Sequence, residues 1–316
     1  MILTGAQILW ESLVREGVRC VFGYPGGAIL PAYDAMLDYP IRHVLVRHEQ
    51  GATHMADGYA RATGEVGVAI ATSGPGATNM VTGIATAMMD SSPIVCITGQ
   101  VGSALIGSDA FQETDITGIT LPITKHNYLV TTPEDVAEAV HEAFYVAKSG
   151  RPGPVLIDIT KDAQQRRCEF RWPPPVRLPG YRPDLTPGDA DLEAAVAMIR
   201  AARRPIIFAG NGILVSDATP LVLRFAEHCD IPIATTLLGI GSVPASHPLN
   251  MGMMGMHGEA WVNTAIQEAD LLLALGMRFD DRVTGNLKTY APLARKIHVE
   301  IDPAEINKNV KVDVAL

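Results

Sequence analysis

The first half of the chain alternates short apolar runs with longer segments whose apolar residues recur every three or four positions. In the opening segment this spacing follows Thr4, a residue suited to cap a helix, and ends at Gly17. The pattern therefore predicts a first helix and then a strand at 18–22. Continued along the chain, it predicts helices at 28–37, 50–63, 77–89 and 133–147 and strands at 41–46, 66–71, 94–98, 123–130 and 155–159.

Strands and helices in regular succession are typical of a parallel sheet covered on both faces. We assign this first domain to residues 1–162, with a long loop at 99–122. Residues 163–188 are rich in proline and arginine and predict an extended connector. A second βα domain is predicted over 189–316, with helices at 192–201, 220–228 and 260–268 and strands at 206–209, 232–235, 271–275 and 296–301.

The expected fold class is thus α/β, with two doubly wound parallel-sheet domains, the second Rossmann-like. The last four residues read as the start of a further strand. We therefore expect the second domain to be incomplete at its C-terminal end.

Composition and charge narrow the function. The 316 residues are 47% hydrophobic and 19% charged with a net charge of −9, and they contain no basic cluster, which argues against nucleic-acid or anionic-membrane partners. The four cysteines are widely spaced, so neither a disulfide framework nor a zinc site is indicated. No apolar run reaches the roughly 20 residues that cross a bilayer. We expect a cytoplasmic protein that acts on small molecules.

Four predicted strands end in residues suited to ligand binding. In an open parallel sheet, ligands bind outside the carboxyl ends of the strands. Any one of these segments is equally well explained as a tight turn, but four at one edge favour a ligand site. The sequence lacks the lysine of a phosphate loop and the serine of a hydrolase elbow. The four segments are Gly23-Tyr24-Pro25-Gly26-Gly27, His48-Glu49-Gln50-Gly51, 72–79 and Thr98-Gly99-Gln100.

Glu49 is the most distinctive residue of these segments. It follows an apolar run and begins a helix rich in small residues. Taken alone, it is better explained as an acid that interacts with the helix dipole than as a catalytic group. The same position, largely dry and close to open backbone, also suits a proton-relay acid.

Eight separate stretches bear on this choice, because together they resemble the thiamine-diphosphate enzymes. Within that superfamily the chain is most similar to the acetohydroxyacid synthase (acetolactate synthase) large catalytic subunits, and the resemblance covers essentially all 316 residues. The stretches are GYPGGAILPAYDA (23–35), RHEQGATHMADGYARATG (47–64), TSGPGATN (72–79), TGQVGSALIGSDAFQETD (98–115), TKHNYLV (124–130), SGRPGPVLIDITKD (149–162), MGMHG (254–258) and GMRFDDRVTG (276–285).

The resemblance implies roles for residues of the first domain. Glu49 is implied to bond N1′ of the cofactor's aminopyrimidine, Gly27 to donate its backbone N–H near the reacting carbon, and Gln112 to reach the site beside the cofactor. Phe111 and Lys161 are implied to line the substrate channel, although without the resemblance plain packing of Phe111 and a solvated contact of Lys161 with Asp162 are the preferred explanations. Further contacts to thiamine diphosphate are implied for Pro25, Gly26, Gly74 and Asn79.

The second domain resembles the FAD-binding domain of the same family, in which the flavin performs no net redox step. Arginine side chains suit a pyrophosphate, and an acid after a late strand suits ribose hydroxyls. A surface ion pair is the alternative explanation for 280–282. The implied FAD contacts are Arg151, Gly210, Gly212, His257, Gly258, Gly276, Arg278, Asp280, Arg282 and Glu300.

The implied activity is that of a transferase of branched-chain amino acid (isoleucine and valine) biosynthesis. It decarboxylates pyruvate and joins the product to pyruvate or 2-ketobutyrate, giving 2-acetolactate or 2-aceto-2-hydroxybutyrate. A homodimer or homotetramer and a small regulatory subunit are also implied.

Two departures from the family pattern stand out. Gly102 occupies a position where many relatives carry proline, and no GDG sequence occurs. We therefore find no metal ligands in this chain, and the resemblance places those of Mg²⁺ in a third, diphosphate-binding domain. The chain is expected to be the N-terminal part of such an enzyme and to be inactive alone.

Alternatives remain open. One is another thiamine-diphosphate enzyme, such as a pyruvate oxidase, an oxo-acid decarboxylase or a flavin-free catabolic acetolactate synthase. The other is a non-catalytic flavin-binding or regulatory module.

Overall fold

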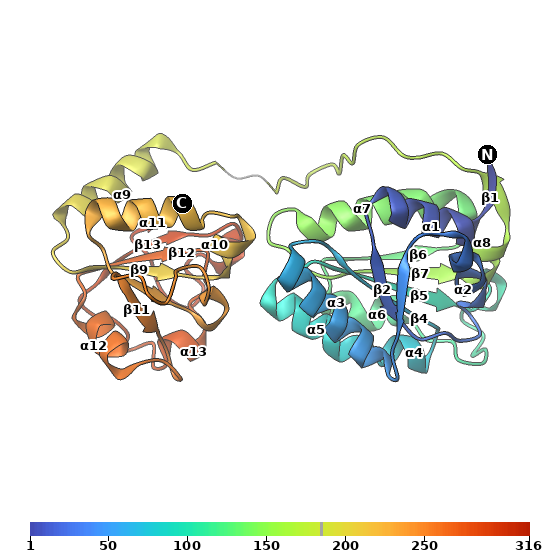
Figure 1. The fold of residues 1–316 in the computed structure, drawn as a ribbon, viewed down its shortest axis with the longest axis horizontal. Helices are drawn as coiled ribbons and strands as arrows, with labels where there is room; N and C mark the ends of the chain where they lie inside the picture. Colours follow the sequence, from blue (N-terminus) through green and yellow to red (C-terminus); the bar gives the residue numbers. More distant parts are fainter. Residues whose placement is uncertain (184–185) are drawn as a thin grey trace. The chain divides into compact units, whose positions relative to one another are not determined.

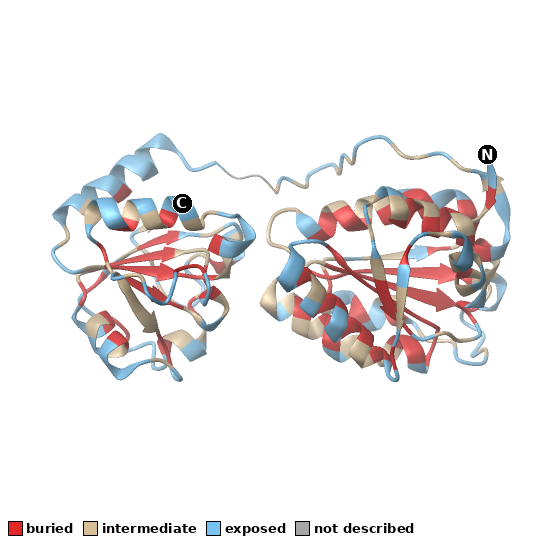
Figure 2. Cartoon of the chain, in the orientation of Figure 1, coloured by how far each residue is buried: buried red, intermediate tan, exposed pale blue. Residues whose placement is uncertain are grey.

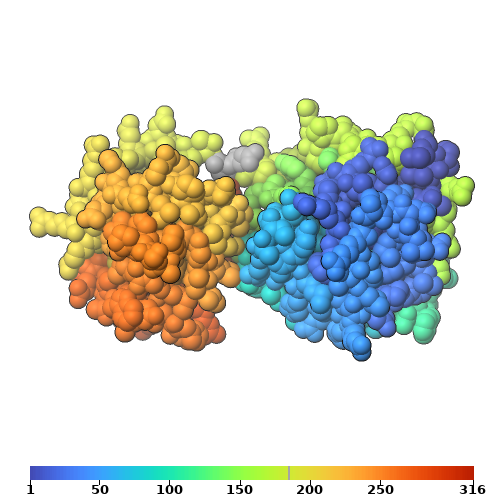
Figure 3. Space-filling model, in the orientation of Figure 1, coloured from blue at the N-terminus to red at the C-terminus, as the bar shows by residue number. Residues whose placement is uncertain are grey.

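The computed structural model describes residues 1–183 and 186–316 and divides into two compact units, Met1–Tyr181 and Arg182–Leu316 (Figure 1). Each unit is closely filled by side chains on the face shown in Figure 3, the first coloured blue to green and the second yellow to red. Each is described separately below as unit 1 and unit 2.

Unit 1 is built on a six-stranded sheet in which every neighbouring pair is parallel. Its strands, in spatial order, are β3 (Arg42–Leu45), β2 (Cys20–Gly23), β4 (Gly67–Ala71), β5 (Ile94–Gln100), β7 (Val155–Thr160) and β6 (His126–Val130). The helices are α1 (Gly5–Arg15), α2 (Leu30–Ala35), α3 (Glu49–Thr63), α4 (Pro75–Thr78), α5 (Val81–Asp90), α6 (Ile116–Thr120), α7 (Val136–Lys148) and α8 (Lys161–Gln165).

The strands of unit 1 are buried on both faces, because alternate residues point into two different apolar clusters. Val68 and Ile70 of β4 pack in the cluster that includes α1 and α7, whereas Ala69 and Ala71 pack with α3 and α5. Figure 2 shows the resulting buried strands between helices with exposed outer faces. Continuous apolar runs in the sequence are the consequence of this two-sided burial.

Unit 2 repeats the architecture with a second six-stranded parallel sheet. Its order is β11 (Asn250–Met253), β10 (Ile233–Thr235), β9 (Pro205–Ala209), β12 (Leu271–Leu275), β13 (Arg295–Val299) and β14 (Val314–Ala315). Apolar clusters cover both faces here as well. The helices are α9 (Asp189–Ala201), α10 (Asn211–Val215), α11 (Thr219–Cys229), α12 (Ala260–Glu268) and α13 (Asp281–Thr284).

These sheets confirm the predicted α/β class with two doubly wound parallel sheets. Local differences have physical causes. The helix predicted at 77–89 is two helices, because Asn79 and Met80 separate α4 from α5. The predicted loop at 99–122 contains α6, and β5 runs on through Gln100.

The segment predicted as a connector is partly folded into unit 1. Strand β8 (Arg167–Glu169) pairs antiparallel with β1 (Ile2–Thr4), and Arg15 lies over the rings of Phe170 and Trp172 at 4.9 and 5.6 Å. Positions 184 and 185 of the predicted connector lie outside the described residues. A pairing between segments more than 160 residues apart leaves no signal in local periodicity.

No helix of the described residues is both long and apolar enough to cross a membrane. In the same residues, no three His, Cys, Asp or Glu side chains gather as a metal site would require.

Candidate active site

The four predicted ligand-binding segments that follow strands of unit 1 are neighbours in space. The sheet order β3, β2, β4, β5 places the segments that follow these strands side by side at one edge. Because all four strands are parallel, their carboxyl ends face the same way. The glycine-rich turns and Glu49 therefore belong to one edge of the sheet.

Glu49 is the first residue of α3 and is only 9% exposed. Its Oε2 accepts a 2.9 Å hydrogen bond from the side-chain amide of Asn79, which follows α4. No hydrogen bond to Oε1 occurs among the described residues. The carboxylate is thus held by one oxygen and can accept from an external donor with the other.

The space beside Glu49 is kept open by Gly76. A Cβ on Gly76 would lie 3.3 Å from Glu49 Oε1 and 2.7 Å from Thr72 Cγ2, which is tighter than a side chain tolerates. Gly26 is similarly close, since its Cβ would lie 2.5 Å from Thr72 Cγ2. Thr72 Oγ1 in turn accepts from the backbone N–H of Ala28 at 3.2 Å. Two small residues and one threonine therefore shape the backbone around the acid.

Helix α3 can hold Glu49 here because it packs very closely on its neighbours. A Cβ on Gly67 of β4 would lie 2.0 Å from the carbonyl oxygen of Ala56, and one on Gly83 of α5 would lie 1.9 Å from Thr53 Oγ1. His48 caps the start of the helix through Nδ1, which accepts from Gln50 N at 3.1 Å, and Gly64 ends it with a positive φ of 73°.

Gly27 lies in the turn between β2 and α2 with open space around its Cα. Within the part of the chain that the structure describes, its N–H has no hydrogen-bond acceptor, whereas the next N–H, that of Ala28, is bonded to Thr72. Pro25 precedes it in the same turn and is half-buried. The Gly27 amide is therefore available to an incoming group.

A tyrosine that sequence reasoning missed lies close to the acid. Burial raises the pKa of the Tyr33 hydroxyl, and the charge of Glu49 raises it further. Tyr33 Oη is 3.1 Å from His43 Nε2, whose pKa is lowered by burial. Tyr33 lies within the GYPGGAILPAYDA stretch, but only the position of α2 against β3 shows that it approaches the site.

The loop after β5 brings Gln112 to Gly74. Gln112 has a positive φ of 58°. A Cβ on Gly74 would lie 2.6 Å from the carbonyl oxygen of Gln112. Phe111 is 87% exposed, so packing within the described residues does not explain it. Lys161 begins α8 and is half-buried, and its neighbour Asp162 accepts from Ser103 N and Oγ at 2.8 and 2.7 Å.

In unit 2 the predicted glycines bring two strand ends together. A Cβ on Gly210 would lie 2.2 Å from Gly276 O, and one on Gly212 would lie 2.7 Å from Gly276 Cα. Gly212 N also donates to Gly276 O at 2.9 Å. The turns after β9 and β12 are therefore in backbone contact, and the Met277 side chain also lies against Gly210.

The predicted polar residues of unit 2 follow the same strand ends. Asp280 caps α13 by accepting from Arg282 N and Val283 N at 3.0 and 3.1 Å. Arg282 and Asp281 are 3.9 Å apart and largely exposed, so their ion pair adds little stability. Arg278 is half-buried in the loop after β12, and His257 and Gly258 follow β11.

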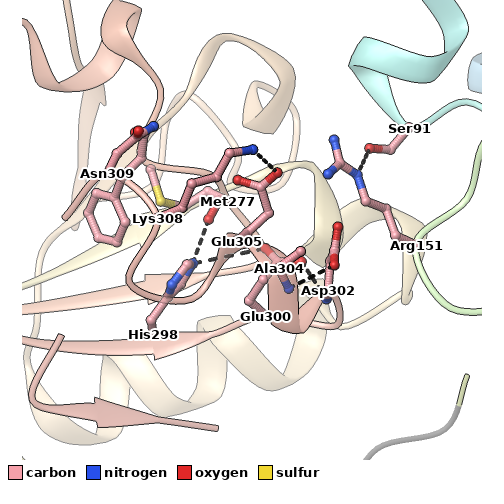
Figure 4. Close-up of polar contacts among 11 residues, drawn as sticks. Ser91, Arg151, Met277, His298, Glu300, Asp302, Ala304, Glu305, Lys308 and Asn309 are labelled. Carbon is pink, nitrogen blue, oxygen red and sulfur yellow. Dashed lines mark hydrogen bonds and ion pairs between the residues drawn. The ribbon is translucent and has the colours of Figure 1, made fainter. Parts of the chain in front are cut away.

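Glu300 follows β13 and points its nearly buried carboxylate toward the end of the sheet, beside His298 (Figure 4). Its Oε1 accepts from Asp302 N at 3.1 Å. His298 is fully buried, its Nε2 lies 2.8 Å from the carbonyl of Met277, and burial lowers its pKa. Nearby, Lys308 donates to Glu305 at 2.9 Å.

Arg151 belongs to unit 1, where its Nε donates to Ser91 Oγ at 2.8 Å (Figure 4). The other predicted flavin contacts lie in unit 2. The predicted contacts to thiamine diphosphate all lie in unit 1.

Two parts of the chain match models of known protein families. Residues 3–119 match the model of the thiamine pyrophosphate enzyme N-terminal TPP binding domain, and residues 192–316 match that of the central domain. The chain belongs to the thiamine pyrophosphate enzyme family.

Its relatives within the family are more specific. It is 55% identical over 315 residues, 99% of the chain, to the acetolactate synthase large subunit of Corynebacterium glutamicum, and equally identical to an acetolactate synthase of Mycobacterium bovis. A probable acetolactate synthase large subunit of Methanocaldococcus jannaschii is 50% identical over 317 residues. The chain spans about half the length of these relatives, from 50% to 54%.

Proposed function

We propose that this chain supplies the pyrimidine-binding and flavin-binding parts of an acetolactate synthase large subunit. The reaction is decarboxylation of pyruvate and condensation with a second 2-keto acid, giving 2-acetolactate or, from 2-ketobutyrate, 2-aceto-2-hydroxybutyrate. The observation that carries this proposal is the Glu49 carboxylate, held through Oε2 by Asn79 and open at Oε1.

This geometry fits the aminopyrimidine of thiamine diphosphate. A carboxylate that is 9% exposed is a strong acceptor for a ring N–H, because little water competes for it. The gap preserved by Gly76 allows a flat ring to approach Oε1. Glu49 would thus hold a proton at pyrimidine N1′, and Pro25, Gly26 and Gly74 would border the ring.

When bound, thiamine diphosphate supplies the nucleophilic carbon and the electron sink of the reaction. The chain's residues bind and orient around it. The free N–H of Gly27 can stabilise negative charge that develops on a substrate oxygen. Gln112, Phe111 and Lys161 would border the path of the substrate, since they lie on the loop and the helix that follow β5 and β7.

FAD fits unit 2 by its donor and acceptor set. The three glycines Gly210, Gly212 and Gly276 allow a ligand to approach backbone closely, and the Glu300 carboxylate suits ribose hydroxyls. Arg278 and Arg282 would bind the pyrophosphate. Asp280, His257, Gly258 and Arg151 complete the proposed set, in which the flavin has a structural role.

We also propose that Mg²⁺ and the cofactor's diphosphate are bound by a third domain, as the family resemblance implies. Assembly as a homodimer or homotetramer, with a small regulatory subunit, belongs to the same proposal. The four cysteines form no disulfide, which is typical of a cytoplasmic protein.

The test is acetolactate formation from pyruvate with thiamine diphosphate, Mg²⁺ and FAD, in the protein together with its diphosphate-binding domain. Glu49→Gln should lower turnover by at least a hundredfold, roughly the contribution of a proton-transfer group, while the cofactor still binds. Glu65→Gln is the matched control, because Glu65 is an exposed acid just beyond α3. Near-normal turnover by Glu49→Gln would contradict the assignment.

A further inference from the structure

The loop from Val101 to Asp115 carries Phe111 and Gln112, and Gln100 joins its two ends. The side-chain Oε1 of Gln100 accepts from Val101 N at 2.9 Å, where the loop begins. Its Nε2 donates to Thr114 O at 2.8 Å, where the loop ends. One buried side chain thus closes a loop of about fifteen residues.

Asp158 of β7 fixes the orientation of that side chain. Its carboxylate is 1% exposed, and it accepts from Gln100 Nε2 at 2.9 Å and from Thr98 Oγ1 at 2.6 Å. A carboxylate and a carbonyl are both acceptors, so both must face the NH₂ end of the glutamine. The oxygen of Gln100 is therefore directed to Val101 N.

Two acids hold the rest of the loop: Glu113 within it and Asp162 of α8 outside it. Asp162 accepts from Ser103 N and Oγ, and Glu113 accepts from the backbone N–H groups of Gly107 and Ala110. The link at the ends of the loop and these two acids together hold the backbone that places Gln112 against Gly74.

We propose that Asp158 is a positioning residue that acts through Gln100 to place the loop 101–115, and with it Gln112, at the edge of the sheet. Asp158 itself touches neither Gly74 nor Glu49 through any hydrogen bond among the described residues. The importance of this placement for catalysis rests on the proposed function. The placement of the loop does not, and it can be tested without cofactor or substrate.

The test is hydrogen exchange of peptides covering 101–115, compared with peptides covering β4. In Gln100→Leu the loop should exchange about tenfold faster, the effect of losing roughly one net hydrogen bond or more, while β4 is unchanged. Asp158→Ala should have the same effect. Asp158→Asn should stay within about twofold of the parent, because its carbonyl oxygen can still accept from Gln100.

The double variant Asp158→Ala/Gln100→Leu tests whether Asp158 affects the loop through Gln100 or independently of it. If Asp158 acts through Gln100, the loop in the double variant exchanges no faster than in either single variant. Thr124→Val is the matched control, because it removes a buried hydroxyl bonded to Thr120 O and Asn127 without touching the loop's ends. It should leave loop exchange unchanged.

The proposal is overturned if the two substitutions increase loop exchange additively in the double variant. It is also overturned if Gln100→Leu leaves loop exchange unchanged, or if exchange in β4 rises as much as exchange in the loop. If Asp158→Ala does not fold, Gln100→Leu and Asp158→Asn still decide the matter. In a preparation that forms acetolactate, Gln100→Leu should lower kcat/KM about tenfold. The large loss of turnover expected for Glu49→Gln is a separate prediction of the proposed function. If hydrogen exchange in the loop rises in Gln100→Leu but kcat/KM does not fall, the result contradicts the proposed function and leaves the placement of the loop by Asp158 supported.

Discussion

Asn79 donates a 2.9 Å hydrogen bond to Oε2 of Glu49, although the two residues are 30 positions apart in the chain. The bond exists because α4 ends one residue before Asn79, beside the N-terminus of α3. It leaves Oε1 facing the gap at Gly76, and so divides the carboxylate into a held oxygen and an available one.

This relationship predicts a specific defect. If the proposed function holds, Asn79→Ala should lower acetolactate formation about tenfold in the protein with its diphosphate-binding domain, because a hydrogen bond to a charged group is lost and the carboxylate is free to rotate. Thr78→Ala is the control, since the Thr78 hydroxyl makes a long, 3.3 Å bond to Pro75 O and, among the described residues, none to Glu49. Steady-state kinetics of both variants give the comparison, and equal rates for the two would refute a role for Asn79.

The close packing of α3 predicts opposite effects for two glycines. Gly67→Ala should destabilise the protein by about 1–3 kcal/mol, because its Cβ would meet the backbone oxygen of Ala56 and α3 would have to shift. Gly58→Ala, in the middle of α3 with open space around it, should stabilise by about 0.5–1 kcal/mol. Urea unfolding measures both. A harmless Gly67→Ala would mean that α3 is not seated as described.

Burial raises the pKa of Asp158 to about 6, and the charge of Asp115 acts in the same direction, against the lowering effect of hydrogen bonds from Thr98 and Gln100. At low pH the carboxyl is protonated in both folded and unfolded states. Above its ordinary pKa of 3.8 the unfolded form ionises first, so this group's contribution to stability falls as pH rises to about 6 and then levels off.

The stability of the parent relative to Asp158→Asn should therefore fall by roughly 2 kcal/mol between pH 4 and pH 7. Urea unfolding at the two pH values tests this. A parent that gains stability over this range, relative to Asp158→Asn, would reverse the predicted sign.

Flavin binding depends, in the proposed function, on the contact between the turns after β9 and β12. Gly212→Ala would place a Cβ 2.7 Å from Gly276 Cα and should reduce FAD retention at least tenfold, because the two turns must separate. Gly188→Ala, where the nearest atom is a flexible Asp191 oxygen at 3.4 Å, should retain FAD normally. Visible flavin absorbance after gel filtration distinguishes them, and full retention by Gly212→Ala would contradict the proposed site.

Much of the fold could be predicted from the sequence because its signals are local. Apolar runs such as 66–71 identify strands buried on both faces, and α3 begins within one residue of its predicted start. The glycines at 26, 74 and 76 were also readable as points of close backbone approach. Their actual contacts, with Thr72 and with Gln112, were not.

What the sequence by itself determined was therefore the succession of strands and helices, the turns at their ends and the presence of an acid at the head of α3. Only the tertiary structure decided that β3, β2, β4 and β5 are neighbours, that β1 pairs with β8, and that Asp158 reaches Gln100 across 58 positions. Periodicity and capping depend on residues a few positions apart. Strand order and the partner of a buried carboxylate depend on which distant surfaces exclude water together, and this is settled only when the chain packs.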